Sequence, residues 1–130
     1  MNINISIDIE DEVRKALTEY ITVYVRPLPE KFTVPSVLIE QMGGTTENTI
    51  DSFLVRLSAR ASTEAEALEL ANVAVGILER QCAVQFGALR HMSQNSLASW
   101  GNDPIRPDLK LATATVQVIA HKESFDIDES

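Results

Sequence analysis

The chain has 130 residues, 45% of them hydrophobic, and a formal net charge of −8 at pH 7. A chain of this length is expected to form a single domain over 1–130 around one core, and its composition excludes a disordered chain. The acidic balance disfavours tight binding to nucleic acid, and no apolar run approaches the roughly 20 residues that cross a bilayer.

An apolar arm precedes the first predicted helix. Isoleucines alternate with polar residues over 3–9, which alone would favour a strand, but from Asp8 the apolar spacing becomes helical. Acidic residues crowd the first turn, where the helix dipole favours negative charge. We therefore expect an arm over 1–7 and a helix over 8–20. The arm lacks the basic and apolar segments of a signal peptide, so none is expected.

Two strand-like runs follow the helix. Residues 21–26 are β-branched and aromatic, and the prolines just after them should end the strand. Residues 36–42 begin directly after Pro35 and are predicted to form a second strand. We expect the glycine pair to close that strand and to open a polar hairpin loop, which consists of Gly43, Gly44, Thr45, Thr46, Glu47 and Asn48.

The hairpin partner follows that loop, from Ile50 into an alanine-rich helix. Phe53, Val55 and Leu57 alternate with polar or basic residues, which predicts a strand with one buried face. Arg56 and Arg60 lie on the opposite face, where we expect solvent or a neighbouring subunit to meet them. A solvated sheet face without a partner is an equally good interpretation of both arginines.

A long helix is predicted from Ser62. Thr63 can cap it, and Glu66 three residues later completes the pattern of a capping box. Its apolar face is broad, and its alanines allow close packing on a sheet. Gly76 near the middle costs roughly 1 kcal/mol relative to alanine and suggests a close contact. Over 82–99 the pattern favours a loop and then strand character near 88–92, and a mobile loop stays open as the alternative.

The last predicted element is a strand of about a dozen residues that ends at His121. Its alternation and length predict that it lies inside the sheet. Before it, the loop from Trp100 to Asp108 contains prolines that stiffen the approach. The predicted fold is α+β, with the order α-β-β-β-α-β-β and two helices on one face of a mostly antiparallel sheet. The acidic residues over 123–130 predict a flexible tail.

The chain shows no convergent set of catalytic residues. Asp103, Asp108 and His121 are candidates for a metal site, but a straight strand would separate Asp108 from His121 by roughly 40 Å. Cys82 has no histidine near it in the sequence, which favours an inert, buried thiol. As the single cysteine it cannot form an internal disulfide, which points to a reducing compartment. We therefore expect no enzyme activity, no cofactor and no bound metal.

Several segments together resemble the tail terminator, or tail completion, proteins of long-tailed bacteriophages and prophages. The segments are the acidic helix IEDEVRKALTEYI, the strand VPSVLIEQMGG, the unit DSFLVRLSARASTEAEALELANVAVGILERQ and the closing DPIRPDLKLATATVQVIAH. In that family a proline-led strand ends near glycines, and a further strand enters an alanine-rich helix through a Thr/Ser-Glu-Ala junction. The resemblance covers most of 8–121 and rests on the order of elements and junctions.

The resemblance implies a structural role in the virion. Members of the family form a ring, usually of six subunits, that caps the tail tube at its head-proximal end and offers a surface to the head connector. DNA passes through the ring without specific binding. The implied partners are other copies of the chain, the tail tube protein and the head connector protein, with assembly in the host cytoplasm and no membrane.

Two other functions stay open at this point. A neck, connector or tail tube subunit would share a related sheet, and a small regulatory domain that binds a metabolite would need a deep apolar pocket. Trp100 fits either the edge of the core or a contact with another chain. The candidate contact residues are the hairpin loop, the two arginines of its partner strand, and, from the proline loop, Trp100, Asp103, Arg106 and Asp108.

Overall fold

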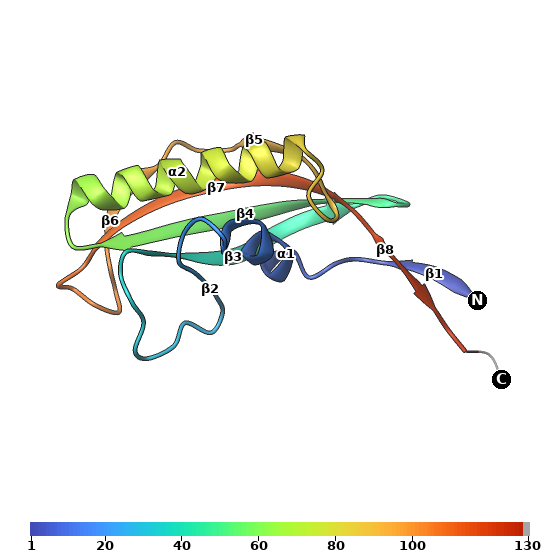
Figure 1. Ribbon diagram of the computed structural model, residues 1–130, viewed down its shortest axis with the longest axis horizontal. Coiled ribbons are helices and arrows are strands. Elements are labelled where there is room, and N and C mark those ends of the chain that lie inside the picture. Colours follow the sequence, from blue (N-terminus) through green and yellow to red (C-terminus); the bar gives the residue numbers. More distant parts are fainter. Residues whose placement is uncertain (129–130) are drawn as a thin grey trace.

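The computed structural model describes residues 1–128, and Figure 1 shows a long helix lying along a curved sheet. Two helices and eight strands occur within that part of the chain. In chain order they are β1 (Asn2–Ile5), α1 (Ile9–Leu17), β2 (Val23–Val25), β3 (Ser36–Thr46), β4 (Ile50–Ala61), α2 (Glu64–Ala83), β5 (Leu89–Gln94), β6 (Ser99–Asn102), β7 (Lys110–His121) and β8 (Glu123–Asp126).

Six strands form one sheet, in the order β2-β3-β4-β7-β5, with β6 also paired to β7. Every pairing is antiparallel except that of β2 with β3, which is parallel. The long alternating strands β4 and β7 lie at its centre, as their patterns predict. The predicted α+β fold is therefore confirmed. The predicted order α-β-β-β-α-β-β is also confirmed, and it corresponds to α1, β2, β3, β4, α2, β5 and β7. The short strands β1, β6 and β8 are additions to it.

The first helix is shorter than predicted. The Asp8 side chain caps it by accepting a hydrogen bond from the Asp11 backbone N–H, and its buried face consists of Ile9, Val13, Ala16 and Leu17. The helix ends at Leu17, three residues before the predicted end, and a turn follows. The residues after it are mostly β-branched or aromatic, and such side chains lose rotamer freedom in a helix.

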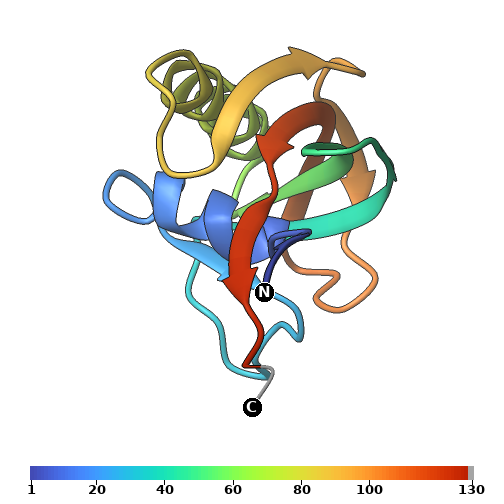
Figure 2. The same cartoon turned by 90° about the vertical axis from the view of Figure 1, so that its right-hand side faces the viewer.

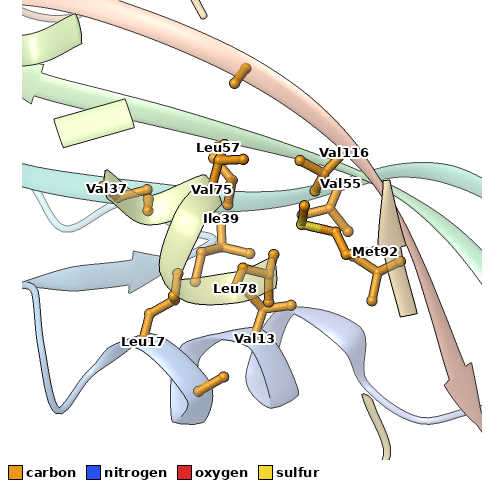
Figure 3. Close-up of a cluster of buried hydrophobic side chains, with 14 of the residues drawn as sticks. Val13, Leu17, Val37, Ile39, Val55, Leu57, Val75, Leu78, Met92 and Val116 are labelled. Carbon is orange, nitrogen blue, oxygen red and sulfur yellow. The ribbon is translucent and has the colours of Figure 1, made fainter. Parts of the chain in front are cut away.

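The core lies between the two helices and one face of the sheet. Figure 3 shows side chains from α1, from α2 and from the sheet gathered there. Ala67, Ala71 and Ala74 of α2 are buried together with its Val75, Leu78 and Cys82, and the helix packs against β4, β5 and β7. Gly76 lies instead on the exposed side of α2, and a Cβ there would meet no atom within 4 Å, so the expected close contact is wrong.

Thr63 caps α2, as the sequence predicts, because its side chain accepts a hydrogen bond from the Glu66 backbone N–H at 3.2 Å. Replacing Thr63 with alanine should lower the free energy of unfolding by about 1 kcal/mol, since one backbone donor then loses its partner. Urea denaturation followed by circular dichroism measures the change. Thr63→Ser keeps the acceptor and should cost much less, and equal losses for both variants would contradict the cap.

The segment over 82–99 proves to be ordered into strands. After α2, Gln85 and Gly87 have positive φ and turn the chain back. The predicted strand near 88–92 is confirmed as β5, which pairs with β7, and β6 then pairs with the other end of β7. The alternative of a mobile loop across this segment is therefore wrong.

The two ends of the chain also differ from the prediction. The arm over 1–7 contains β1, and the predicted flexible tail over 123–130 contains β8, with which β1 pairs antiparallel. The tail prediction is therefore wrong for residues 123–126, because backbone pairing with a partner far away in the sequence overrides their polar composition. Glu129 and Ser130, the end of that predicted tail, lie outside the described residues.

Candidate functional site

The face of the sheet that carries no helix is the candidate functional surface, and we call it the open face. Strand register fixes its members, because paired residues point to the same side. At its centre lie half-buried side chains of β3, β4 and β7, namely Glu40, Leu54, Arg56, Thr113, Thr115, Gln117 and Ile119. Most of these groups are polar and able to form hydrogen bonds, which is typical of a contact surface rather than of a core.

An ion pair lies in the middle of the open face. Arg56 donates to Glu40 Oε1 at 2.9 Å, and the two residues are directly paired across β3 and β4. Arg56 therefore points away from the core, as predicted, and is half-buried by its neighbours. Sequence reasoning missed Glu40, although a glutamate in the strand opposite a basic position is a usable signal for such a pair.

Arg60 is buried, contrary to the expectation that solvent or a neighbouring subunit meets it. Its Nε donates to Asp103 Oδ2 at 2.7 Å, and the two residues are 5% and 3% exposed. The Asp103 carboxylate also accepts a hydrogen bond from the Ile105 backbone N–H. The proline loop therefore folds over this end of the open face, and Arg60 and Asp103 hold it down instead of forming an accessible contact.

The ion pair of Arg60 and Asp103 predicts that the stability of the fold depends on pH in a specific way. Burial raises the pKa of the Asp103 carboxyl, but the hydrogen bonds from Arg60 and Ile105 and the charge of Arg60 lower it more, so it lies below its ordinary value. Because the pKa is lower in the folded state, the ionised carboxyl stabilises the fold at pH values above the ordinary pKa of about 3.9. This stabilisation is lost as the pH falls through the folded-state pKa. Asp103→Asn removes this titration.

The advantage of the natural protein over Asp103→Asn in free energy of unfolding should therefore be constant from about pH 7 to pH 5 and should shrink below about pH 4. Urea denaturation at a series of pH values measures it, and Asp108→Asn is the matched control because that carboxylate is exposed. If the difference in free energy of unfolding between the natural protein and Asp103→Asn stays the same down to pH 3, the lowered pKa of Asp103 is refuted.

An aromatic residue joins the two loops at this end of the open face. Phe32, from the loop between β2 and β3, lies under two guanidinium groups, 5.7 Å from that of Arg60 and 6.0 Å from that of Arg106. Arg106 in turn forms an exposed ion pair with Asp108. Of the predicted contact residues in the proline loop, Arg106 and Asp108 are thus accessible. Sequence reasoning missed Phe32, because no local pattern distinguishes it from an ordinary loop residue.

Trp100 lies on the helix side of the sheet, because it pairs with Ala112 of β7. Its indole N–H donates to the Glu64 carbonyl O at the start of α2, at 3.0 Å. The side chain is nevertheless 56% exposed. Trp100 therefore fixes β6 to α2 at the rim of the core, and more than half of its surface stays available for contacts.

The predicted hairpin loop is mostly strand. Gly43 to Thr46 belong to β3, and only Glu47 and Asn48 fall in the turn. The glycines accompany a β-bulge, where the register with β4 shifts between Gln41 and Gly43. The prediction of a glycine turn is therefore wrong, because the extra residue at the bulge is absorbed inside the strand.

Gly44 approaches the neighbouring strand so closely that a Cβ there would overlap the Ser52 carbonyl O. Gly44→Ala should therefore lower the free energy of unfolding by about 1 to 3 kcal/mol, since the β3 and β4 backbones must separate. Thermal denaturation measures the loss. Gly101→Ala is the control, because Gly101 also lies in a strand but has open space around it, and equal effects would contradict the close approach.

Asp51 lies at the end of β4, where the chain ends leave the body. It is 4% exposed, its carboxylate lies 3.9 Å from Lys122 Nζ, and it lines a hollow of about 300 Å³ together with Ser6 and Thr46. Burial raises its pKa, but the Thr46 and Ser6 hydroxyls and the Lys122 charge bring it below the ordinary value. Sequence reasoning missed this residue, although an aspartate at an apolar strand position is a signal.

The side chains considered as metal ligands in the sequence lie apart from one another in the structure. Asp108 precedes the first residue of β7 and His121 is its last, so the 12-residue strand separates them. Among the described residues no group of three or more acidic, histidine or cysteine side chains could hold a metal ion. Cys82 is buried, and this burial raises the pKa of its thiol to about 11, so it carries little thiolate at neutral pH.

No protein-family model matches the chain, and no curated protein matches it. Neither helix in the described part of the chain is long and apolar enough to span a membrane. The described residues present a polar open face, two sheet edges and a pair of strands, β1 and β8, that leave the body together.

Proposed function

We propose that this chain is a non-catalytic ring subunit that caps the end of a phage tail tube and forms the joint to the head connector. In this proposal six copies close a ring at the head-proximal end of the virion tail, after assembly in the host cytoplasm. The ring stops growth of the tube, and DNA passes through it without specific binding. The partners are further copies, the tail tube protein and the connector protein.

The observation that carries the proposal is the one-sided sheet. Helices cover one face, whereas the open face presents the Glu40–Arg56 pair and the threonines and glutamine of β7. The sheet ends in β2 on one side and in β5 and β6 on the other, and such edges carry backbone groups that a neighbour can pair with. A ring subunit needs two lateral contact surfaces and one surface toward the opening, and this sheet supplies all three.

The charge of the chain supports the same role. With a net charge of −8 for each copy, a ring of six copies would carry a large negative charge, which repels the phosphate backbone. Repulsion keeps DNA from adhering to the wall of the passage. The order of elements from α1 to β7, on which the resemblance to tail terminators rests, agrees with the proposal as well.

The test uses the full chain and the tail tube protein of the phage or prophage that encodes it. Negative-stain electron microscopy and light scattering should show a closed ring with a central opening. Added to polymerising tail tube protein, the ring should stop elongation and give shorter tubes with a disc at one end. Matched amounts of serum albumin are the control and should leave the tube length unchanged.

Other results would decide for the alternatives. A chain that copolymerises along the tube is a tube subunit, and one that binds only the connector is a neck protein. A monomer at every concentration that binds a small metabolite would overturn the structural role altogether. Gene order gives an independent check, because a terminator gene is expected between the connector genes and the gene of the major tail protein.

A further inference from the structure

The two chain ends form a ribbon that projects from the body. Within residues 1–128, β1 and β8 form a separate two-stranded sheet, with Ile3 opposite Phe125 and Ile5 opposite Glu123. Figure 1 shows β1 and β8 at the same end of the molecule, and Figure 2 views the molecule from that end. The Met1 amino group closes the ribbon by donating to the Ile127 carbonyl O and to Asp126. Two strands alone are marginally stable in water, so such a ribbon gains stability from a docking surface.

One face of the ribbon is apolar. Residues that are paired or two apart share a face, which places Met1, Ile3, Ile5, Phe125 and Ile127 on one side and Asn2, Asn4, Ser124 and Asp126 on the other. Phe125 is 52% exposed and Met1 59%. Glu123, opposite Ile5, adds one negative charge to the apolar side. This face combines a central aromatic group with an acidic group near its root.

The root of the ribbon is fixed to the body. Lys122, between β7 and β8, forms an ion pair with the buried Asp51, and its backbone N–H donates to the Thr49 carbonyl O. Ser6, which follows β1, lies in the hollow beside Asp51. Both ribbon strands are therefore held at one charged point of β4. A ribbon held in this way presents its apolar face in a defined direction.

The body carries a complementary patch on the outer side of α2. Val73, Ile77 and Val84 follow one another at helical spacing, and Tyr20 borders them together with the Arg80 guanidinium. Val73 is 42% exposed, Val84 60% and Tyr20 59%. Glu66 and Glu69 lie by the other end of the stripe. The basic, C-terminal part of the stripe thus suits an apolar surface that carries a negative charge.

We propose that the ribbon of one copy docks on the α2 patch of a second copy, with Phe125 against Val73 and Ile77 and with Glu123 opposite Arg80. The inference rests on the proposed ring, and it adds to the sheet edges a second contact between neighbouring subunits. The two surfaces are unlike and belong to the same chain, so the contact is head-to-tail, and such a contact forms a ring when the rotation between copies closes. An aromatic anchor in an apolar patch is the usual centre of such an interface.

The first experiment measures self-association by sedimentation velocity. Phe125→Asp should weaken it at least about tenfold, because a charge replaces the anchor. Ser124→Asp is the matched control, since it adds the same charge on the polar face of the same strand, and it should assemble as the natural chain does. Arg80→Glu and Glu123→Arg should each weaken assembly, and the two together should restore it.

The second experiment locates the contact by cross-linking. Phe125→Cys and Val73→Cys chains, mixed and oxidised, should form a disulfide-linked dimer, whereas each alone should not. The mixture of Ser124→Cys with Val73→Cys is the control. A Phe125→Cys chain that cross-links to itself would replace the proposal by ribbon-to-ribbon pairing.

The outcomes separate this inference from the proposed function. If rings form and Phe125→Asp leaves them intact, the docking contact is refuted while the ring stands. If Phe125→Asp dissolves rings that fail to cap tail tubes, the docking contact stands and the terminator role is refuted. A natural chain that stays monomeric at every concentration refutes both.

Discussion

Replacing Asp103 with alanine is expected to lower the free energy of unfolding by about 3 to 5 kcal/mol, as found when one partner of a buried ion pair is removed. The reason is the position of Arg60, which is 5% exposed and donates to Asp103 at 2.7 Å. Without the carboxylate its charge stays buried beside the ring of Phe32 and has lost its ion-pair partner. Urea denaturation followed by circular dichroism measures the loss.

A double variant separates the ion pair from general packing. Arg60→Met together with Asp103→Leu removes both charges and keeps apolar volume, so it should recover most of the loss. Asp108→Ala is the matched control: its partner Arg106 is exposed, and the expected change is below about 1 kcal/mol. A loss of less than 1 kcal/mol for Asp103→Ala would show that water or another group replaces the carboxylate.

Local patterns explain why much of the fold could be predicted. The alternation in β4 and β7 shows which face each residue takes, and the register pairs Leu57 with Ala114 and Val55 with Val116 on the helix side, as expected. The capping signal at Thr63 is confirmed, and α2 starts at Glu64, two residues after the predicted start at Ser62. Alternation and capping residues lie within a few residues of the strand or helix end that they predict. A single sequence is therefore enough to recognise them.

Contacts between distant segments could not be read in this way. Alternation correctly placed Arg60 opposite the core, but no local pattern shows that Asp103, 43 residues later, covers it. The isoleucine alternation over 3–9 did signal a strand, yet its partner β8 lies at the other end of the chain. For the glycine pair, a turn and a bulge have the same composition, and only the register between β3 and β4 distinguishes them.

Replacing Leu78 with alanine is expected to lower the free energy of unfolding by about 2 to 5 kcal/mol. Leu78 is fully buried and belongs to the core between α1, α2 and the sheet (Figure 3). The substitution removes its apolar contacts and leaves a cavity, which the long strands β4 and β7 cannot close without losing their register. Urea denaturation followed by circular dichroism gives the loss.

Two further variants show whether the loss comes from the cavity. Leu97→Ala removes the same atoms from a side chain that is 83% exposed, so it should change stability by less than about 0.5 kcal/mol. Leu78→Met keeps the volume and should cost less than about 1.5 kcal/mol. If Leu78→Ala costs no more than Leu97→Ala, α2 does not anchor the sheet through this residue. The α2 patch would then lack the rigid support that a docking surface needs.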